Sequence, residues 1–128
     1  MIWSIRSRES NDVVIKVSDA FFEWLRPHVE DATVRAFDPY RDTTLRTSDL
    51  ERWRAALSRA RERRRQQEEE RVTISRRLPR EAVARKALVA DWVERELSGD
   101  ANYKTLLELE AALALALESG AEVKVSGD

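Results

Sequence analysis

The sequence predicts a small α+β domain in which a mainly antiparallel sheet packs against three to four helices. Three observations lead to this fold class. Stretches with strand-like composition lie near both ends of the chain, at residues 2–5, 13–17 and 121–125. Long stretches with helical periodicity lie between them, and 128 residues is a usual length for one domain. We therefore expect a single domain over residues 1–128.

The N-terminal stretch is expected to form a β-hairpin. Ile2, Trp3 and Ile5 are followed by the polar segment RSRESND at 6–12 and then by VVIKV at 13–17. β-branched and aromatic residues on both sides of a polar segment are typical of two strands joined by a turn.

A short, mostly buried helix is expected next, with Ser18 as its N-cap. Its apolar positions are Phe21, Phe22, Trp24 and Leu25. Pro27 disfavours helical geometry at Arg26, so the helix should end there. The following stretch ATVRAF, residues 32–37, alternates in polarity and predicts a third strand.

The stretch after this strand combines a turn with a helix start. Pro39 fixes its own backbone and disfavours helical geometry at Asp38, whose carboxylate is suited to bind nearby amides. Ser48 and Glu51 match the S-x-x-E capping box, so a helix should begin near Asp49. Its buried stripe is predicted to be Leu50, Trp53, Leu57 and Ala60.

The charged run from residue 61 to residue 71 should be solvated on all sides if the helix continues through it. Arg64 could pair with Glu68, and Arg65 with Glu69, at i,i+4 spacing. Each such pair gives only a few tenths of a kcal/mol in this order. Stability alone therefore does not explain the run.

Two further helices and a last strand are expected. After Pro79 an amphipathic helix should run to Gly99, with its apolar positions at Val83, Ala87, Leu88, Trp92 and Val93. Asp100 should cap the next helix, the most buried one, which Gly120 ends. Its apolar face is predicted to contain Leu106, Leu109, Leu113 and Leu117, widened by Leu107 and Leu115.

The final strand should place Val123 and Val125 on one sheet face and join the N-terminal strands. A helical bundle with strand-like ends is the alternative architecture, because the central helices are long.

Composition narrows the classes of function. The chain has 23 Lys and Arg against 24 Asp and Glu, and this net charge of -1 gives no global reason to expect nucleic acid or an anionic membrane as a partner. The absence of cysteine excludes disulfides, thiolate zinc sites and cysteine nucleophiles. No segment reaches the roughly 18 apolar residues of a membrane span, so we expect a cytoplasmic protein without membrane contact.

The sequence offers few residues suited to catalysis. His28 is the only histidine and follows a proline, where a surface or capping role is the usual one. Glu30 and Asp31 follow in HVED, but a divalent metal needs convergent ligands that the sequence does not show. Asp38 and Asp42 are expected to serve the turn. We expect no enzyme, no cofactor and no metal.

The arginine cluster at residues 59–65 is the best nucleic-acid candidate, since neighbouring guanidiniums on a helix can bind successive phosphates. Acidic residues at 62 and 68–70 interrupt and follow it, and no aromatic residue is present for base stacking. A protein partner is the favoured interpretation. The residues expected to contact it are Arg61, Arg64, Arg65, Glu68, Glu69 and Glu70, together with Asp38, Tyr40 and Asp42 from the turn.

Two patches of the sequence resemble a known group of proteins. FDPYRDTTL at 37–45, followed by a predicted helix, resembles the DPYGDT signature of small bacterial proteins that end in a short strand and GD. VKVSGD at 123–128 is similar to that ending, and Arg41 stands in place of the glycine. These proteins look like the immunity proteins of polymorphic toxin systems.

The resemblance implies a stoichiometric inhibitor that binds a cognate bacterial toxin. Two other classes remain open: a nucleic-acid-associated regulatory factor that uses residues 59–65, and a homo-oligomeric adaptor built on the long helices. Salt-dependent binding to nucleic acid would favour the first of these. A mass measurement in solution would test the second.

Overall fold

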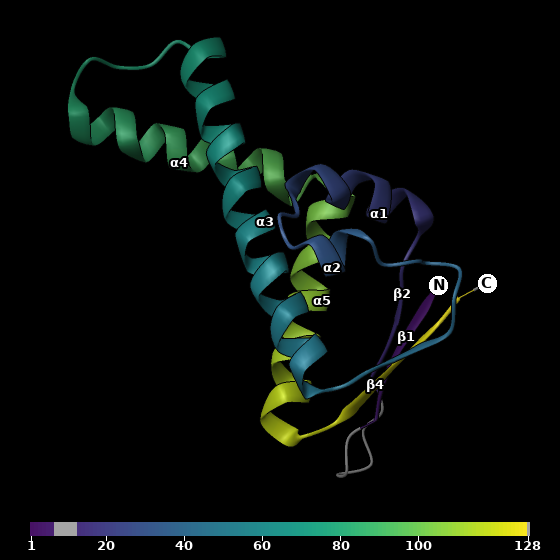
Figure 1. Ribbon diagram of the computed structural model, residues 1–128. Helices are drawn as coiled ribbons and strands as arrows, with labels where there is room; N and C mark the ends of the chain where they lie inside the picture. The colour runs from purple at the N-terminus through teal and green to yellow at the C-terminus, as the bar shows by residue number, and fades with distance from the viewer. Residues whose placement is uncertain (7–12, 128) are drawn as a thin grey trace.

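The computed structural model describes residues 1–6 and 13–127, and it confirms the α+β class (Figure 1). The strands are β1 (Ile2–Arg6), β2 (Val13–Lys16), β3 (Thr43–Leu45) and β4 (Glu122–Ser126). The helices are α1 (Asp19–Leu25), the 3-10 turn η1 (Arg26–His28), α2 (Ala32–Arg35), α3 (Thr47–Ser75), α4 (Ala82–Ser98) and α5 (Ala101–Ser119).

The four strands form one antiparallel sheet in the order β2-β1-β4-β3. Pairing of β1 with both β2 and β4 confirms that the two ends of the chain share a sheet. Trp3 lies opposite Val125, and Ile5 lies opposite Val123, so these side chains share one buried face. The turn of the predicted hairpin, at 7–12, lies outside the described residues.

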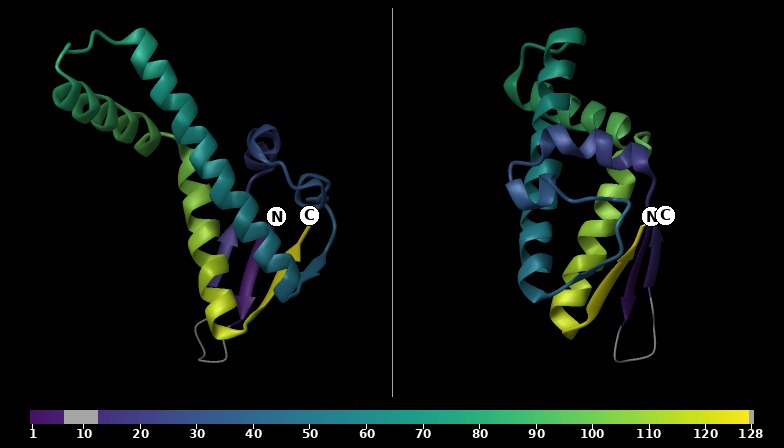
Figure 2. Two further views of the ribbon diagram at one scale, coloured as in Figure 1. Left: turned by 60° about the vertical axis from the view of Figure 1, so that its left-hand side comes forward. Right: turned by 45° about the vertical axis from the view of Figure 1, so that its right-hand side comes forward.

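Helices α3 and α5 lie side by side over the buried face of the sheet (Figure 2). Four of the predicted helical positions, Leu50, Trp53, Leu57 and Ala60, are at most 3% exposed, which confirms the stripe. Between sheet and helices lies an aromatic cluster in which Trp53 is 5.1 Å from both Trp3 and Phe37, measured between ring centroids. Edge-on contacts of this kind add to the burial of apolar area.

The strand predicted at residues 32–37 is wrong. Residues Ala32–Arg35 form α2, because the Asp31 carboxylate accepts hydrogen bonds from the backbone N–H groups of Thr33 (2.9 Å) and Val34 (3.1 Å). An acceptor at this position satisfies amides that a helix start leaves unpaired. The edge of the sheet beside β4 is occupied by β3 instead.

The cap of α3 also differs from the prediction. The helix begins at Thr47, so Ser48 lies inside the first turn instead of capping it. The Asp49 carboxylate accepts a hydrogen bond from the backbone N–H of Arg46 at 3.1 Å. Asp49 therefore performs the role that the S-x-x-E pattern assigned to Glu51, two residues earlier in the chain.

The other two long helices begin and end close to the predicted positions. Glu81 accepts hydrogen bonds from the N–H groups of Val83 and Ala84 at the start of α4, and Gly99 follows its end. Asp100 caps α5, and Gly120 ends it with a positive φ of 65°. Leu106, Leu109 and Leu113 are fully buried, as predicted, whereas Leu107 and Leu115 are exposed.

Helix α3 continues past the sheet, and α4 packs against this outer part (Figures 1 and 2). We call residues 66–97 the arm. Val83 and Ala87, predicted on the apolar face of α4, are exposed in the arm, and only Val93 and Leu97 of α4 are buried. Among the described residues, none of the helices has the length and apolar character needed to cross a membrane.

Candidate functional site

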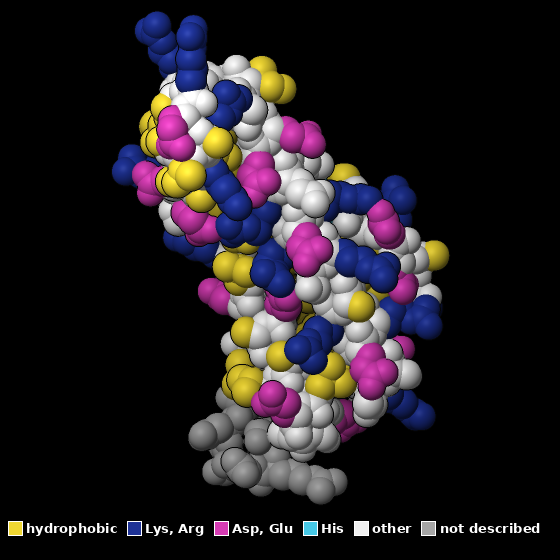
Figure 3. Space-filling view, turned by 90° about the vertical axis from the view of Figure 1, so that its left-hand side faces the viewer, with side chains coloured by type: hydrophobic (Ala, Val, Ile, Leu, Met, Phe, Trp, Pro, Cys, Tyr) yellow, Lys and Arg dark blue, Asp and Glu magenta, His cyan; other side chains and the backbone are white. Residues whose placement is uncertain are grey.

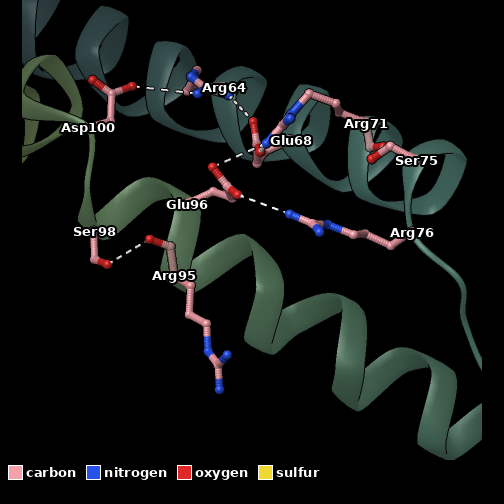
Figure 4. Close-up of polar contacts among 9 residues, drawn as sticks. All are labelled: Arg64, Glu68, Arg71, Ser75, Arg76, Arg95, Glu96, Ser98 and Asp100. Carbon is pink, nitrogen blue, oxygen red and sulfur yellow. Dashed lines mark hydrogen bonds and ion pairs between the residues drawn. The ribbon is translucent and has the colours of Figure 1, made fainter.

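The arm is fixed to the body at a buried carboxylate. Glu68 of α3 is 2% exposed, and its carboxylate accepts hydrogen bonds from Arg64 at 2.8 Å and from Arg71 (Figure 4). Arg64 lies 3.5 Å from the carboxylate of Asp100, and Arg71 lies 3.2 Å from that of Glu96. The prediction that residues 61–71 are solvated on all sides is therefore wrong, because this side of α3 faces α4 and α5.

Further polar contacts join α3 and α4. Arg65 pairs with Glu94 at 2.5 Å, and its hydrogen bond with the hydroxyl of Tyr103, followed by this pair, raises the pKa of Arg65. Arg76 lies 3.6 Å from Glu96 and stacks its guanidinium 4.0 Å from the ring centroid of Trp92. Together with buried Val72, Val93 and Leu97, these contacts hold α4 in place.

Glu68→Gln is expected to lower the free energy of unfolding by about 1 to 3 kcal/mol near neutral pH, since hydrogen bonds to a charged group are lost. The hydrogen bond from Arg71 holds the pKa of the Glu68 carboxyl below its ordinary range, against the opposing effect of burial. The advantage of the wild-type protein should therefore be complete above about pH 4.3 and should disappear as the pH falls through the folded-state pKa.

Chemical denaturation of both proteins over a series of falling pH values measures this effect. The control is Glu62→Gln, the same change at an exposed position of α3 that makes no ion pair among the described residues. A stability difference between wild type and Glu68→Gln that stayed constant with pH would contradict the assigned role of the carboxylate.

The outer half of the arm carries an open groove. One hollow of about 370 Å³ follows a stripe of α3: Gln66, Glu69, Glu70, Thr73 and Ile74. A second hollow of about 400 Å³ follows a stripe of α4 and shares Glu69 with the first; its other lining residues are Ala82, Arg85, Lys86, Val89 and Ala90. Ile74 is 86% exposed, so the groove presents apolar surface to solvent.

The end of the arm is basic. Residues 72–90 contain five Lys and Arg against one acidic residue, although the whole chain has a net charge of -1. Arg77, Arg80, Arg85 and Lys86 make no ion pair among the described residues, and Val83 beside them is 76% exposed. Figure 3 shows Lys and Arg side chains projecting from this end of the molecule.

The residues predicted to bind a partner fall into two groups on α3. The first group makes internal ion pairs: Arg61 with Glu110 at 2.9 Å, Arg64 with Glu68 and Asp100, and Arg65 with Glu94. The second group, Glu69 and Glu70, is exposed and lines the groove. The predicted i,i+4 pair of Arg64 and Glu68 forms, whereas Arg65 pairs across to α4.

The predicted turn residues meet the C-terminal end of the chain. Asp38 accepts a hydrogen bond from the N–H of Tyr40 at 2.9 Å, as its expected turn role requires. Asp42 accepts one from the N–H of Gly127, also at 2.9 Å, across 85 positions of sequence. Tyr40 remains 63% exposed. The described residues of the two patches that carry the family resemblance therefore contact each other.

His28 and the acidic residues that follow it lie in separate environments. The Nδ1 atom of His28 is buried and has no hydrogen-bond partner among the described residues, and burial together with the charges of Arg64 and Arg63 lowers the pKa of His28. Glu30 pairs with Arg63, and Asp31 caps α2. Among residues 1–6 and 13–127 there is no group of three or more His, Asp or Glu side chains placed to hold a metal ion.

Sequence reasoning missed the groove and the basic end. The available signal for the basic end was the excess of five Lys and Arg over one acidic residue at 72–90, whereas the groove depends on where α3 and α4 lie relative to each other. None of the protein-family models, curated proteins or solved structures compared with the chain matches it.

Proposed function

We propose that this protein is a stoichiometric protein-binding inhibitor whose arm binds an acidic surface of its partner. The resemblance of the 37–45 and 123–128 patches to immunity proteins supports a cognate bacterial toxin as that partner. Binding rather than catalysis fits the distribution of charged groups, because the arginines at 61, 63, 64 and 65 of α3 are held in ion pairs to residues outside the helix.

The observation that carries the proposal is the group of unpaired cations beside an exposed apolar side chain at the end of the arm. Arg77 and Arg80 follow α3, and Val83 opens α4 next to them. Arginine is enriched at protein interfaces because its planar guanidinium binds carboxylates bidentately and its stem packs on apolar surface. A partner that brings carboxylates around an apolar centre complements this surface.

Charge segregation supports an acidic partner in a second way. The end of the arm is positive, because the five basic residues at 72–90 outweigh the single acidic one. The rest of the chain is therefore net negative, since the whole chain has a net charge of -1. A local field of this kind speeds association with an acidic surface and orients it toward the arm. The effect should weaken as the salt concentration rises.

The same basic end favours a second candidate, a nucleic-acid-associated factor. Its four unpaired cations are suited to phosphate contacts. Residues 72–90 contain no aromatic side chain, however, so bases have nothing to stack on. Binding without base contacts would depend steeply on salt and would not depend on sequence, which distinguishes it from binding to one protein.

The test is a binding measurement with the product of the gene immediately upstream. The wild-type chain should form a one-to-one complex with this product and suppress its activity. Arg77→Glu combined with Arg80→Glu should weaken the complex about tenfold or more, because like charges would then face each other. The matched control is Arg54→Glu with Arg59→Glu, two exposed arginines on α3 that make no ion pair among the described residues.

Each contrary outcome excludes a different part of the proposal. Absence of a complex would exclude the upstream product as a cognate toxin. A complex that tolerates the change at 77 and 80 within about twofold would place the interface outside the arm's end. Equal binding of the wild-type chain to unrelated nucleic acid duplexes would favour the second candidate.

A further inference from the structure

We propose that the groove of the arm binds the same groove of a second copy of this chain, so that the α3 stripe of each arm contacts the α4 stripe of the other. This inference does not rest on the proposed function. It concerns the groove between α3 and α4, whereas the proposed partner contact uses Arg77, Arg80 and Val83, none of which lines the groove.

The spacing of the groove residues is that of a helix-packing seam. On α3 the lining residues follow the spacing 3-1-3-1 from Gln66 to Ile74, and on α4 they follow it from Ala82 to Ala90. Residues three and four apart share one face of a helix, so each stripe is a continuous face. Each face can therefore pack against a helix of a second molecule.

The apolar content of the groove is exposed. Ile74 is 86% exposed, and Ala82 and Ala90 are exposed as well. Small alanine side chains on α4 allow close approach of another helix, and Ile74 supplies a large side chain to insert. Covering these residues would remove apolar surface from water, at about 25 cal/mol per Å² buried.

The charges of the two stripes identify a second copy as the occupant. The α3 stripe carries Glu69 and Glu70, and the α4 stripe carries Arg85 and Lys86. None of these four side chains makes an ion pair within the described residues. A two-fold axis along the groove would place the acidic stripe of each copy opposite the basic stripe of the other.

Other kinds of partner would be complementary in charge to only one of the two stripes. Nucleic acid or a uniformly acidic protein would face repulsion from Glu69 and Glu70, and a uniformly basic protein would face it from Arg85 and Lys86. An isologous interface requires a surface that is complementary to itself, and two adjacent stripes of opposite charge meet that requirement.

The experiment measures mass in solution by sedimentation equilibrium across a range of protein concentrations. Wild type should be a dimer. Variant A is Glu69→Lys with Glu70→Lys, and variant B is Arg85→Glu with Lys86→Glu. Each variant alone should have a dimer dissociation constant about tenfold or more above that of wild type. In a dimer of one variant, both contacts across the two-fold axis would join like charges. An equimolar mixture of A and B should dimerise, since every contact then joins opposite charges.

Two further proteins separate loss of the interface from loss of folding. The variant that carries all four changes should dimerise with itself, because its two stripes have only exchanged charge. Glu51→Lys with Glu118→Lys is the matched control, with the same charge change at exposed positions outside the arm, and it should dimerise like wild type. Far-UV circular dichroism of each protein checks its helix content.

Three results would overturn the proposal. The first is a wild-type protein that remains monomeric at all concentrations tested. The second is a dimer that persists unchanged in both A and B. The third is folded A and B that fail to associate when mixed. Rescue in the mixture together with self-association of the four-change variant would establish the paired stripes as the contact.

Discussion

Replacing Leu57 by alanine is expected to lower the free energy of unfolding by about 2 to 5 kcal/mol. Leu57 is fully buried on α3, which packs against α5. The change removes apolar atoms and leaves a cavity, and both effects destabilise the folded state. Chemical denaturation monitored by circular dichroism gives the value.

The matched control for this change is Leu115→Ala on α5. Leu115 is 58% exposed, so the same truncation there removes little buried area and should cost less than about 1 kcal/mol. Equal losses at the two positions would mean that α3 does not contribute its stripe to the core.

Gly127→Ala is expected to destabilise the protein by about 1 to 3 kcal/mol or more. A Cβ at this position would lie 2.3 Å from the carbonyl carbon of Tyr40 and 2.6 Å from the backbone nitrogen of Arg41. Backbone atoms cannot rotate away as a side chain does, so the 38–42 turn and the end of β4 must separate. The hydrogen bond from the Gly127 N–H to Asp42 would be lost with that movement.

Gly99→Ala is the control for the glycine change. A Cβ there would meet its nearest neighbour at 3.7 Å, which is an ordinary contact, and the backbone φ of -88° suits any residue. This substitution should be neutral or stabilising by up to about 1 kcal/mol, because alanine restricts the unfolded chain. A melting temperature for Gly127→Ala equal to that of wild type would show that the turn and β4 do not touch.

The sequence predicted correctly those elements in which apolar residues recur with the period of a helix or a strand. The stripe of α3 and the alternation of Val123 and Val125 each reflect one face turned toward the core. Local propensity was a poorer guide in short segments. Residues 32–35 resemble a strand in composition, but the Asp31 cap and the pairing of β3 with β4 make them helical.

The candidate site was predicted in part. The sequence left open whether the helix that starts near Asp49 continues through the charged segment, and α3 does continue, with Glu69 and Glu70 exposed as expected. The burial of Glu68 could not be predicted, because its cause is α4 and α5, whose positions relative to α3 depend on tertiary packing. The contact between Asp42 and Gly127 likewise joins residues 85 positions apart, and no local pattern specifies such a pair.

The continuity of α3 has a geometric consequence for the length of this protein's sequence. A helix of 29 residues spans roughly 44 Å, and each residue turns it by about 100°. Inserting or deleting one residue between Ala60 and Arg64 would turn the outer part of α3 by about 100° relative to its body-facing stripe, and would carry the buried side chains of Glu68 and Val72 away from their contacts. The number of residues in this segment of α3 therefore sets the angular phase that lets Glu68 and Val72 meet α4 and α5.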